Sequence, residues 1–259
     1  MITFAPFYKN LKNSPEAMSS ELKERVDSFD YINAIERLRD TFYAYNSSDH
    51  KFVVQTDELT DTRGIDSFRT DLSDVPLMGA IVKANTNFVL NNTGKLILTG
   101  ADHLICGNVD IFFKDSFDLC FFVHPKKRYV RNSVVLVNSN PDNKEGINEF
   151  FRRREDFYHL ATDEEKKWGA DMYSITRALE EKGLITKYFN DKSNHFFDYN
   201  GLKVKILDYD GLKYVKPLSA DGRLVVNKLD IVIDVKGGNY RKRFFMKAYE
   251  ELMRGKKKL

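Results

Sequence analysis

Two acidic residues far apart in the chain follow stretches that are expected to form strands. Asp102 comes after the apolar residues 95–98 and the turn residues 99–101, and Asp234 lies near the end of the apolar residues 229–235. Carboxylate oxygens are the ligands that Mg²⁺ and Mn²⁺ prefer in proteins. The pair predicts a divalent metal site if the fold brings the two strand ends together. A cation held there would stabilise the negative charge of a leaving phosphate.

The residues that follow Asp234 suit contact with an anion. Lys236 supplies a positive charge, and Gly237 and Gly238 allow the backbone to come close to a ligand. We therefore expect this turn to lie beside a phosphate group.

Further polar residues lie in or next to the predicted strands and helices. Asn132 and Ser133 precede a buried strand, Asp171 lies near the start of a helix, and Lys83 lies in the helix upstream of Asp102. In α/β proteins such residues gather at the carboxyl ends of the strands, where ligands bind.

The elements that would position these residues alternate between strands and helices. Apolar runs predict strands at residues 2–7, 51–55, 95–98, 109–113, 119–123, 133–137 and 229–235. Helical spacing predicts helices at residues 28–45, 76–90, 146–181 (two helices, with a break near Ala161 and Thr162) and 240–253. Between them, residues 56–74 read as a polar loop, residues 188–217 as strands and loops, and Ser73 or Asp74 as a helix cap. This alternation predicts an α/β fold with helices on both faces of a central sheet.

Residues 96–113 read Leu-Ile-Leu-Thr-Gly-Ala-Asp-His-Leu-Ile-Cys-Gly-Asn-Val-Asp-Ile-Phe-Phe. This segment resembles the metal-binding strand and turn of GT-A glycosyltransferases, in particular the lipopolysaccharide galactosyltransferase and glycogenin group. Asp102 matches the second Asp of that group's Asp-x-Asp motif, and Gly100 stands in place of the first. The resemblance implies a single GT-A-type domain over residues 1–245, with a mixed central sheet, followed by a basic helix end and tail at residues 246–259.

The resemblance also implies an activity, namely transfer of a sugar from a nucleoside diphosphate sugar, a UDP-sugar first of all, to a hydroxyl acceptor. Mn²⁺ or Mg²⁺ would be held by Asp102 and by Asp234, which replaces the group's His. Asp171 would lie near the anomeric carbon, and Lys236 would assist the leaving diphosphate. Retention of configuration is what the group implies, whereas the residues themselves leave retention and inversion open. The other residues expected at the donor are Phe4, Ala5, Tyr8, Thr56, Asp57, Lys83, Gly100, Ala101, Asn132, Ser133 and Gly237.

Composition narrows the class of protein but not the acceptor. The chain has 259 residues, 42% of them hydrophobic, and a net charge of +3, so it can bury a large core. Basic residues gather at 126–131, 152–154 and 241–258, which suits an anionic acceptor such as a hydroxymethylated base in DNA, as some phage enzymes use, or a glycan. The same basic residues also suit contact with an anionic membrane surface. No run of about 18 apolar residues is present, so a cytoplasmic protein is expected, in the host cytoplasm if phage-encoded.

Two other classes of protein compete with the glycosyltransferase. Residues 229–236 also fit the Asp/Glu-x-Lys strand of magnesium-dependent nucleases, with Asp234 and Lys236 catalytic and Asp210 or Asp221 as a further ligand. A nucleic-acid-binding module without enzymatic activity would explain the basic clusters alone. Neither explains residues 96–113.

Overall fold

The computed structural model describes residues 1–10, 31–73, 75–166, 169–208, 215–217, 232–234 and 241–256. Its strands are β1 (Ile2–Phe7), β2 (Lys51–Phe52), β3 (Val54–Thr56), β4 (Ser67–Arg69), β5 (Gly94–Gly100), β6 (His103–Ile105), β7 (Leu119–Val123), β8 (Val130–Ser139), β9 (Phe196–Tyr199), β10 (Leu202–Asp208), β11 (Val215–Pro217) and β12 (Val232–Asp234). Its helices are α2 (Tyr31–Tyr45), α3 (Leu77–Asn91), the 3₁₀ helix η3 (Val109–Phe113), α4 (Lys144–Leu160), α5 (Ala170–Glu180), α6 (Leu184–Asn190) and α7 (Arg241–Lys256).

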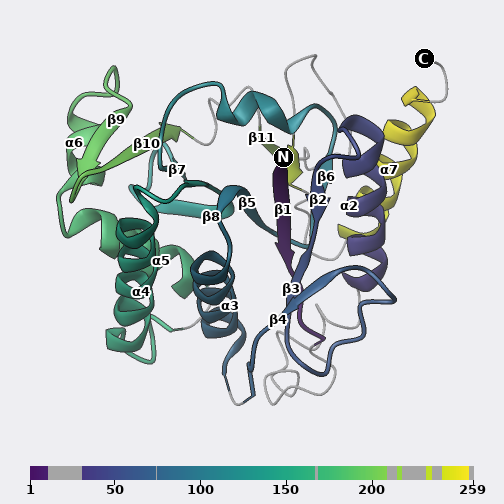
Figure 1. Cartoon of the computed structure of the whole chain (residues 1–259), viewed down its shortest axis with the longest axis horizontal. Helices are drawn as coiled ribbons and strands as arrows, with labels where there is room; N and C mark the ends of the chain where they lie inside the picture. Colours follow the sequence, from purple (N-terminus) through teal and green to yellow (C-terminus); the bar gives the residue numbers. More distant parts are fainter. Residues whose placement is uncertain are drawn as a thin grey trace.

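One large mixed sheet organises the described residues (Figure 1). Its order is β4-β3-β1-β5-β8-β7-β10-β9, with β2 paired to β1. β8 is antiparallel to its neighbours β5 and β7, and β9 is antiparallel to β10, whereas the remaining pairs are parallel. The strands β4, β3, β1, β5, β7 and β10 therefore run in one direction. Their carboxyl ends form a single edge of the sheet, called the carboxyl edge below, and β8 begins at that edge.

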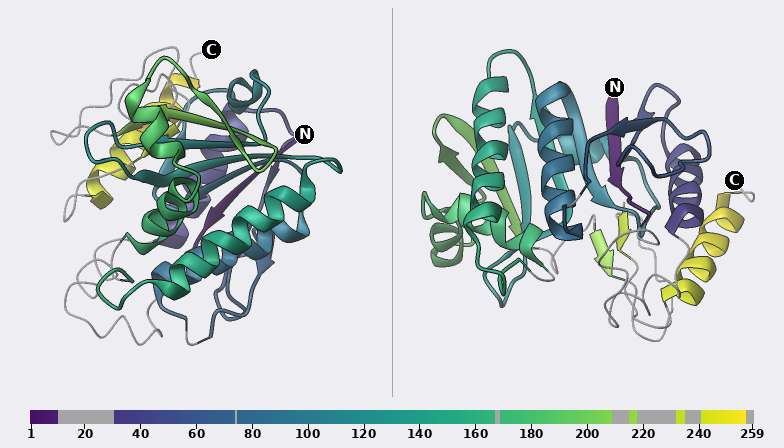
Figure 2. Two further views of the ribbon diagram at one scale, coloured as in Figure 1. Left: turned by 90° about the vertical axis from the view of Figure 1, so that its left-hand side faces the viewer. Right: turned by 90° about the horizontal axis from the view of Figure 1, so that it is seen from below.

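Apolar side chains fill both faces of this sheet. On one face α3, α4, α5 and α6 enclose a core that includes Phe121 and Phe150. On the other face α2 and η3 enclose a second core that includes Phe4 and Phe42. Figure 2 shows α2 and α7 on one side of the sheet and α3 and α4 on the other. Burial on both faces explains why strands such as β7 are continuously apolar instead of alternating.

Several predicted elements are confirmed. Residues 2–7 form β1, residues 95–98 lie in β5, residues 119–123 form β7 and residues 133–137 lie in β8. The break expected near Ala161 and Thr162 separates α4 from α5. The two cysteines, Cys106 and Cys120, are free and buried. Within the described residues, no helix has the length and apolar character needed to cross a membrane.

The prediction of a strand at residues 109–113 was wrong, because this segment forms the 3₁₀ helix η3. The side chain of Asn108 accepts a hydrogen bond from the backbone N–H of Asp110 at 2.8 Å and so caps the helix. Apolar and aromatic content alone cannot separate a short buried strand from a short buried helix.

Three local predictions also need correction. The loop expected at residues 56–74 contains β4, which pairs with β3. The strand expected at residues 51–55 is divided at Val53, whose N–H donates to the carbonyl of Phe4 at 3.0 Å. Residues 188–190 belong to α6 and not to a loop.

The cap expected for α3 differs as well. Pro76 occupies the N-cap position with no side-chain hydrogen bond. Ser73 hydrogen bonds to Asp71 instead, and Asp74 lies outside the described residues.

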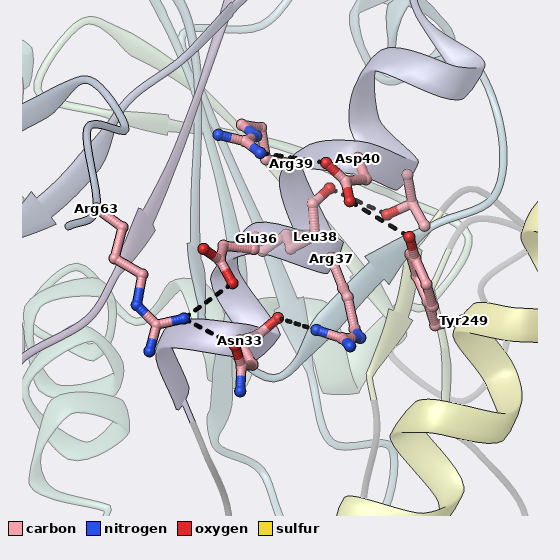
Figure 3. Close-up of polar contacts among 9 residues, drawn as sticks. Asn33, Glu36, Arg37, Leu38, Arg39, Asp40, Arg63 and Tyr249 are labelled. Carbon is pink, nitrogen blue, oxygen red and sulfur yellow. Dashed lines mark hydrogen bonds and ion pairs between the residues drawn. The ribbon is translucent and has the colours of Figure 1, made fainter.

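Polar contacts attach two distant segments to α2 (Figure 3). Arg63 donates to the side chain of Asn33 at 2.9 Å, which ties the segment before β4 to the start of the helix. Tyr249 of α7 donates to Asp40 at 3.3 Å, and the guanidinium of Arg37 lies 5.2 Å from the Tyr249 ring centroid. These contacts, together with the apolar cluster between α2, β6 and α7, join the end of the chain to the sheet domain.

Phe150 lies at the centre of an aromatic cluster on the α4 face of the sheet. Its ring centroid lies 5.3 Å from that of Phe121, 5.7 Å from Phe151 and 5.2 Å from Tyr199, and its side chain has no exposed surface. Phe150→Ala is expected to lower the free energy of unfolding by about 3–5 kcal/mol, because it removes buried area and leaves a cavity. Urea denaturation followed by circular dichroism measures this, and the partly exposed Phe196→Ala is the matched control. Equal losses in the two variants would contradict the assigned core.

Candidate active site at the carboxyl edge

The carboxyl ends of β4, β3, β1, β5, β7 and β10 and the start of β8 lie at the carboxyl edge. Register places Phe7 of β1 opposite Gln55 of β3 and Gly100 of β5. Thr99 of β5 lies opposite Val134 of β8. The segments that follow β1, β3 and β5, and the segment that begins β8, therefore meet at one place in the sheet. This is where most of the predicted site residues lie.

Asp102 lies in the turn between β5 and β6, about one-fifth exposed at 22%. Its Oδ1 is 3.4 Å from Nδ1 of His103, and the same His103 nitrogen is 3.1 Å from the carbonyl oxygen of Gly100. A Cβ atom added at Gly100 would come within 3.0 Å of the Asp102 carboxylate oxygen. Glycine at position 100 thus leaves the room that the Asp102 carboxylate occupies, which gives a physical reason for the missing first acid of the Asp-x-Asp pattern.

The second predicted acid comes close to this turn through the backbone. β12 pairs with β6 in antiparallel register, and Asp234 lies opposite His103. The backbone of Asp234 is therefore adjacent to the residue that follows Asp102. Lys236 and Gly237 lie outside the described residues, as do Asp210 and Asp221.

A divalent cation at this turn would have the Asp102 carboxylate as a ligand. No group of three or more His, Cys, Asp or Glu side chains with metal-binding geometry occurs in the part of the chain that the structure describes. Mg²⁺ in sites that bind phosphates usually takes one or two carboxylates from the protein and completes its shell with water and phosphate oxygens. The structure places the Asp102 carboxylate at this turn and the backbone of Asp234 opposite His103, the residue next to Asp102.

Asn132 and Asp171, two residues 39 positions apart, are in direct contact. The Asn132 side-chain amide donates to Oδ2 of Asp171 at 2.7 Å. Asn132 lies near the start of β8, and Asp171 lies in the first turn of α5 and is 9% exposed. The backbone carbonyl of Ser133 accepts a hydrogen bond from the Thr99 hydroxyl at 2.7 Å, which fixes the start of β8 to the end of β5. The fold therefore holds Asp171 by an amide that belongs to the same sheet edge as Asp102.

The nucleotide contacts expected from β1 need a correction. Phe4 and Ala5 have no exposed surface, and Phe4 stacks on Phe52 at 5.8 Å between ring centroids. Neither side chain can lie against a base in this conformation. Tyr8 follows the end of β1, is partly exposed, and its backbone N–H donates to Gln55 at 2.9 Å. Of the three residues predicted from β1 and its end, Tyr8 alone has exposed surface.

The loop after β3 is held by its own hydrogen bonds. Asp57 accepts from the backbone N–H of Thr60 at 2.7 Å. Arg69 donates to the backbone carbonyls of Asp57 at 2.7 Å, Glu58 at 3.1 Å and Thr60 at 3.1 Å. The hydroxyl of Thr56 is buried and has no hydrogen-bond partner among the described residues. Asp57 thus organises the loop, and Thr56 keeps an unused hydroxyl at the end of β3.

Lys83 and Ala101 occupy two further predicted positions. Lys83 lies in α3 and is partly buried. Hydrogen bonds from Ser73 lower the pKa of Asp71, and the charge of Lys83 adds a smaller effect in the same direction, so Lys83 lies near the segment after β4. Ala101 is only 5% exposed and packs in the core on the α2 face, so only its backbone can approach a donor.

Sequence reasoning missed His103 and Arg154. His103 is buried, and its Nε2 has no hydrogen-bond partner within the described residues. Its place directly after Asp102 was a signal that could have been used. Arg154 is fully buried in α4, whereas the sequence shows it only as the third member of a basic run.

Comparison with known proteins adds to this geometry. No protein-family model matches the sequence, and no curated protein matches it. Among solved structures, the chain is similar to the glycosyltransferase GlyE of Streptococcus pneumoniae TIGR4, with a TM-score of 0.50 and 12% identity. The alignment covers 98% of this chain and 63% of that one. The chain therefore shares its fold with this structure. Because the chain spans less than two thirds of that structure and the identity is low, this similarity bears on the fold alone.

The predicted fold class is confirmed by this similarity and by the mixed sheet with helices on both faces. The nuclease alternative gains no support. Of its residues, only Asp234 lies within the described part of the chain, and its backbone pairs with the turn that carries Asp102.

Proposed function

We propose that this chain is a metal-dependent glycosyltransferase that moves a sugar from a nucleoside diphosphate sugar, a UDP-sugar first of all, to a hydroxyl acceptor. One observation carries the proposal. In a fold shared with a glycosyltransferase, the turn with Asp102 follows β5, and Asn132, which hydrogen bonds to Asp171 of α5, lies at the start of the neighbouring strand β8.

The diphosphate of the donor would lie at the turn after β5. Asp102 and Asp234 would hold Mn²⁺ or Mg²⁺, which supplies charge neutralisation for the leaving diphosphate. The room left by Gly100 and the backbone pairing of Asp234 with His103 support this assignment. Lys236 and Gly237 would follow directly after β12, where a lysine and a close backbone suit a phosphate.

The sugar would lie between that turn and the start of α5. Asp171 would face the anomeric carbon with its carboxylate oriented by the Asn132 amide, which supports a role at the reacting centre. Ser133 and Lys83 would contact the sugar or its phosphate, and Tyr8, Thr56 and Asp57 would surround the base. The resemblance to enzymes that retain configuration makes retention the proposed outcome.

A donor screen tests the proposal. The chain is incubated with UDP-, GDP- and dTDP-sugars and Mn²⁺ without acceptor, and release of the nucleoside diphosphate is followed by chromatography. Slow hydrolysis of one donor is expected, because water can replace the acceptor hydroxyl. A nuclease or a binding module would leave every sugar nucleotide intact, and that result would overturn the proposal.

The acceptor is proposed to be anionic. Lys126, Lys127 and Arg128 are exposed in the segment between β7 and β8, and this segment lies at the carboxyl edge because β7 runs parallel to β5. Three adjacent cations beside a donor site raise the local concentration of a polyanion. Hydroxymethylated DNA and an acidic glycan both meet this requirement.

Charge reversal in this segment tests the acceptor class. Lys126→Glu with Lys127→Glu is expected to raise the acceptor KM about tenfold and to weaken its salt dependence, while donor hydrolysis without acceptor stays unchanged. Lys182→Glu with Lys187→Glu is the matched control, because both are exposed and lie beyond the end of α5 that is distant from Asp171. Steady-state kinetics with hydroxymethylated duplex DNA and with an acidic oligosaccharide identifies the acceptor. An unchanged KM for the acceptor used would contradict this assignment.

A further inference from the structure

Arg154 is a charged residue in a place that normally holds an apolar side chain. It lies within α4, has no exposed surface, and is the only buried Lys or Arg in the described ranges. Its Nε and both Nη atoms have no hydrogen-bond partner there. Burying an ion without such partners costs several kcal/mol, and an apolar residue of the same size is often as stable or more so. Packing alone therefore does not account for arginine at this position.

The acid that balances this charge is Asp171. Burial lowers the pKa of the Arg154 guanidinium to about 10, and the charge of Asp171 acts in the opposite direction, followed by that of Glu155. With a pKa of about 10 the guanidinium stays protonated at neutral pH. The elements that carry the two residues are in contact, since Tyr158, one turn after Arg154, packs in one cluster with Ala170, the neighbour of Asp171.

Asp171 is held from its other side by the sheet. Asn132 of β8 donates to its Oδ2 at 2.7 Å, and the hydroxyl of Ser174 donates to its backbone carbonyl at 3.0 Å. The carboxylate thus has a hydrogen-bond donor on β8 and a buried positive charge on α4. Because Arg154 makes no hydrogen bond within the described residues, it acts on Asp171 by charge and leaves the carboxylate oxygens for other partners.

We propose that Arg154 is a positioning residue whose buried positive charge holds the Asp171 carboxylate in place for the donor sugar. This inference rests on the proposed function. Arg154 itself does not contact the donor, because it has no exposed surface. A carboxylate that faces a developing positive charge at the anomeric carbon must carry its own negative charge when the reaction begins.

The kinetic test uses Arg154→Met, which keeps the side-chain volume, and Arg154→Lys, which keeps the charge. Arg154→Met is expected to lower kcat for donor hydrolysis roughly 10- to 100-fold with little change in donor KM, and Arg154→Lys to restore part of the loss. In an Asp171→Asn background, Arg154→Met is expected to cause no further loss, because it acts through that carboxylate. The control is Arg153→Met, because Arg153 is partly exposed and its guanidinium pairs with Glu181 at 2.6 Å instead of lying near Asp171. The kcat of this variant is expected to stay unchanged.

The outcomes separate this inference from the proposed function. An unchanged kcat in Arg154→Met would overturn the positioning role. So would an equal fold-loss of kcat from Arg154→Met in the wild-type and Asp171→Asn backgrounds. Neither result would bear on the proposed glycosyltransferase activity. A wild-type chain that hydrolyses no donor would refute the proposed function instead.

Thermal melting tests the pair without any activity. Arg154→Met is expected to lower Tm in the wild-type background, where it leaves the buried acid without its counter-charge. It is expected to raise Tm in the Asp171→Asn background, where it removes a lone buried charge. The same shift in both backgrounds would show that the two residues do not interact. If Arg154→Met fails to fold, Arg154→Gln in the two backgrounds provides the same comparison, because it also removes the charge.

Discussion

Asp102→Ala is expected to lower kcat for donor hydrolysis by about 10³-fold or more, with the fold intact. The carboxylate of Asp102 lies in the turn after β5 and is partly exposed, so its removal costs little core packing. If it holds the cation that neutralises the diphosphate, the leaving group loses the charge stabilisation on which departure depends. The measurement is steady-state release of nucleoside diphosphate at saturating donor and Mn²⁺, with circular dichroism to confirm the fold.

The matched control for this variant is Asp142→Ala. Asp142 is exposed and follows the end of β8, so it lies at the opposite edge of the sheet from the proposed site. Its kcat is expected to equal that of the wild type. An Asp102→Ala protein that retains wild-type turnover would remove Asp102 from the mechanism, and with it the role proposed for the turn after β5.

Removal of divalent cations is expected to abolish turnover and to leave the protein folded. The protein would supply only one or two carboxylates to the cation, so we expect the cation to bind together with the donor and not as a structural element. Treatment with a chelator should therefore reduce hydrolysis to background, whereas Tm without donor should hardly change. Mn²⁺ or Mg²⁺ should restore turnover.

Two further measurements sharpen the metal experiment. Addition of UDP with Mn²⁺ should raise Tm more than either alone, because ligands that bind only the folded state stabilise it by mass action. This joint effect should disappear in Asp102→Ala. Full turnover in the presence of chelator would mean that protein groups alone stabilise the leaving diphosphate, and the metal assignment would then be wrong.

The sequence by itself determined the elements whose local signals are strong. The apolar residues of β1, β5 and β7 predicted strands, because such runs can be buried only inside a sheet. The turn at Asp102 followed from the glycine and acid that end β5, and the break between α4 and α5 followed from the loss of helical spacing. The alternation of elements was enough to predict the α/β fold and the sheet edge at which the site residues lie.

The sequence could not decide which residues of these elements are accessible. Parallel strands are buried on both faces, so β1 carries no alternation that would identify Phe4 and Ala5 as core residues. Residues 109–113 were mistaken for a strand for a related reason, since five apolar residues fit a buried strand and a buried 3₁₀ helix equally well.

Only the tertiary structure decided which charges meet. Arg153 and Arg154 are adjacent in one basic run, yet successive residues of an α-helix point about 100° apart, so one is exposed beside Glu181 and the other is buried near Asp171. The contact of Asn132 with Asp171 joins β8 to α5, and the pairing of Asp234 with His103 joins positions more than a hundred residues apart. Such contacts depend on how helices pack on a sheet and on strand order, and neither leaves a local pattern in the chain.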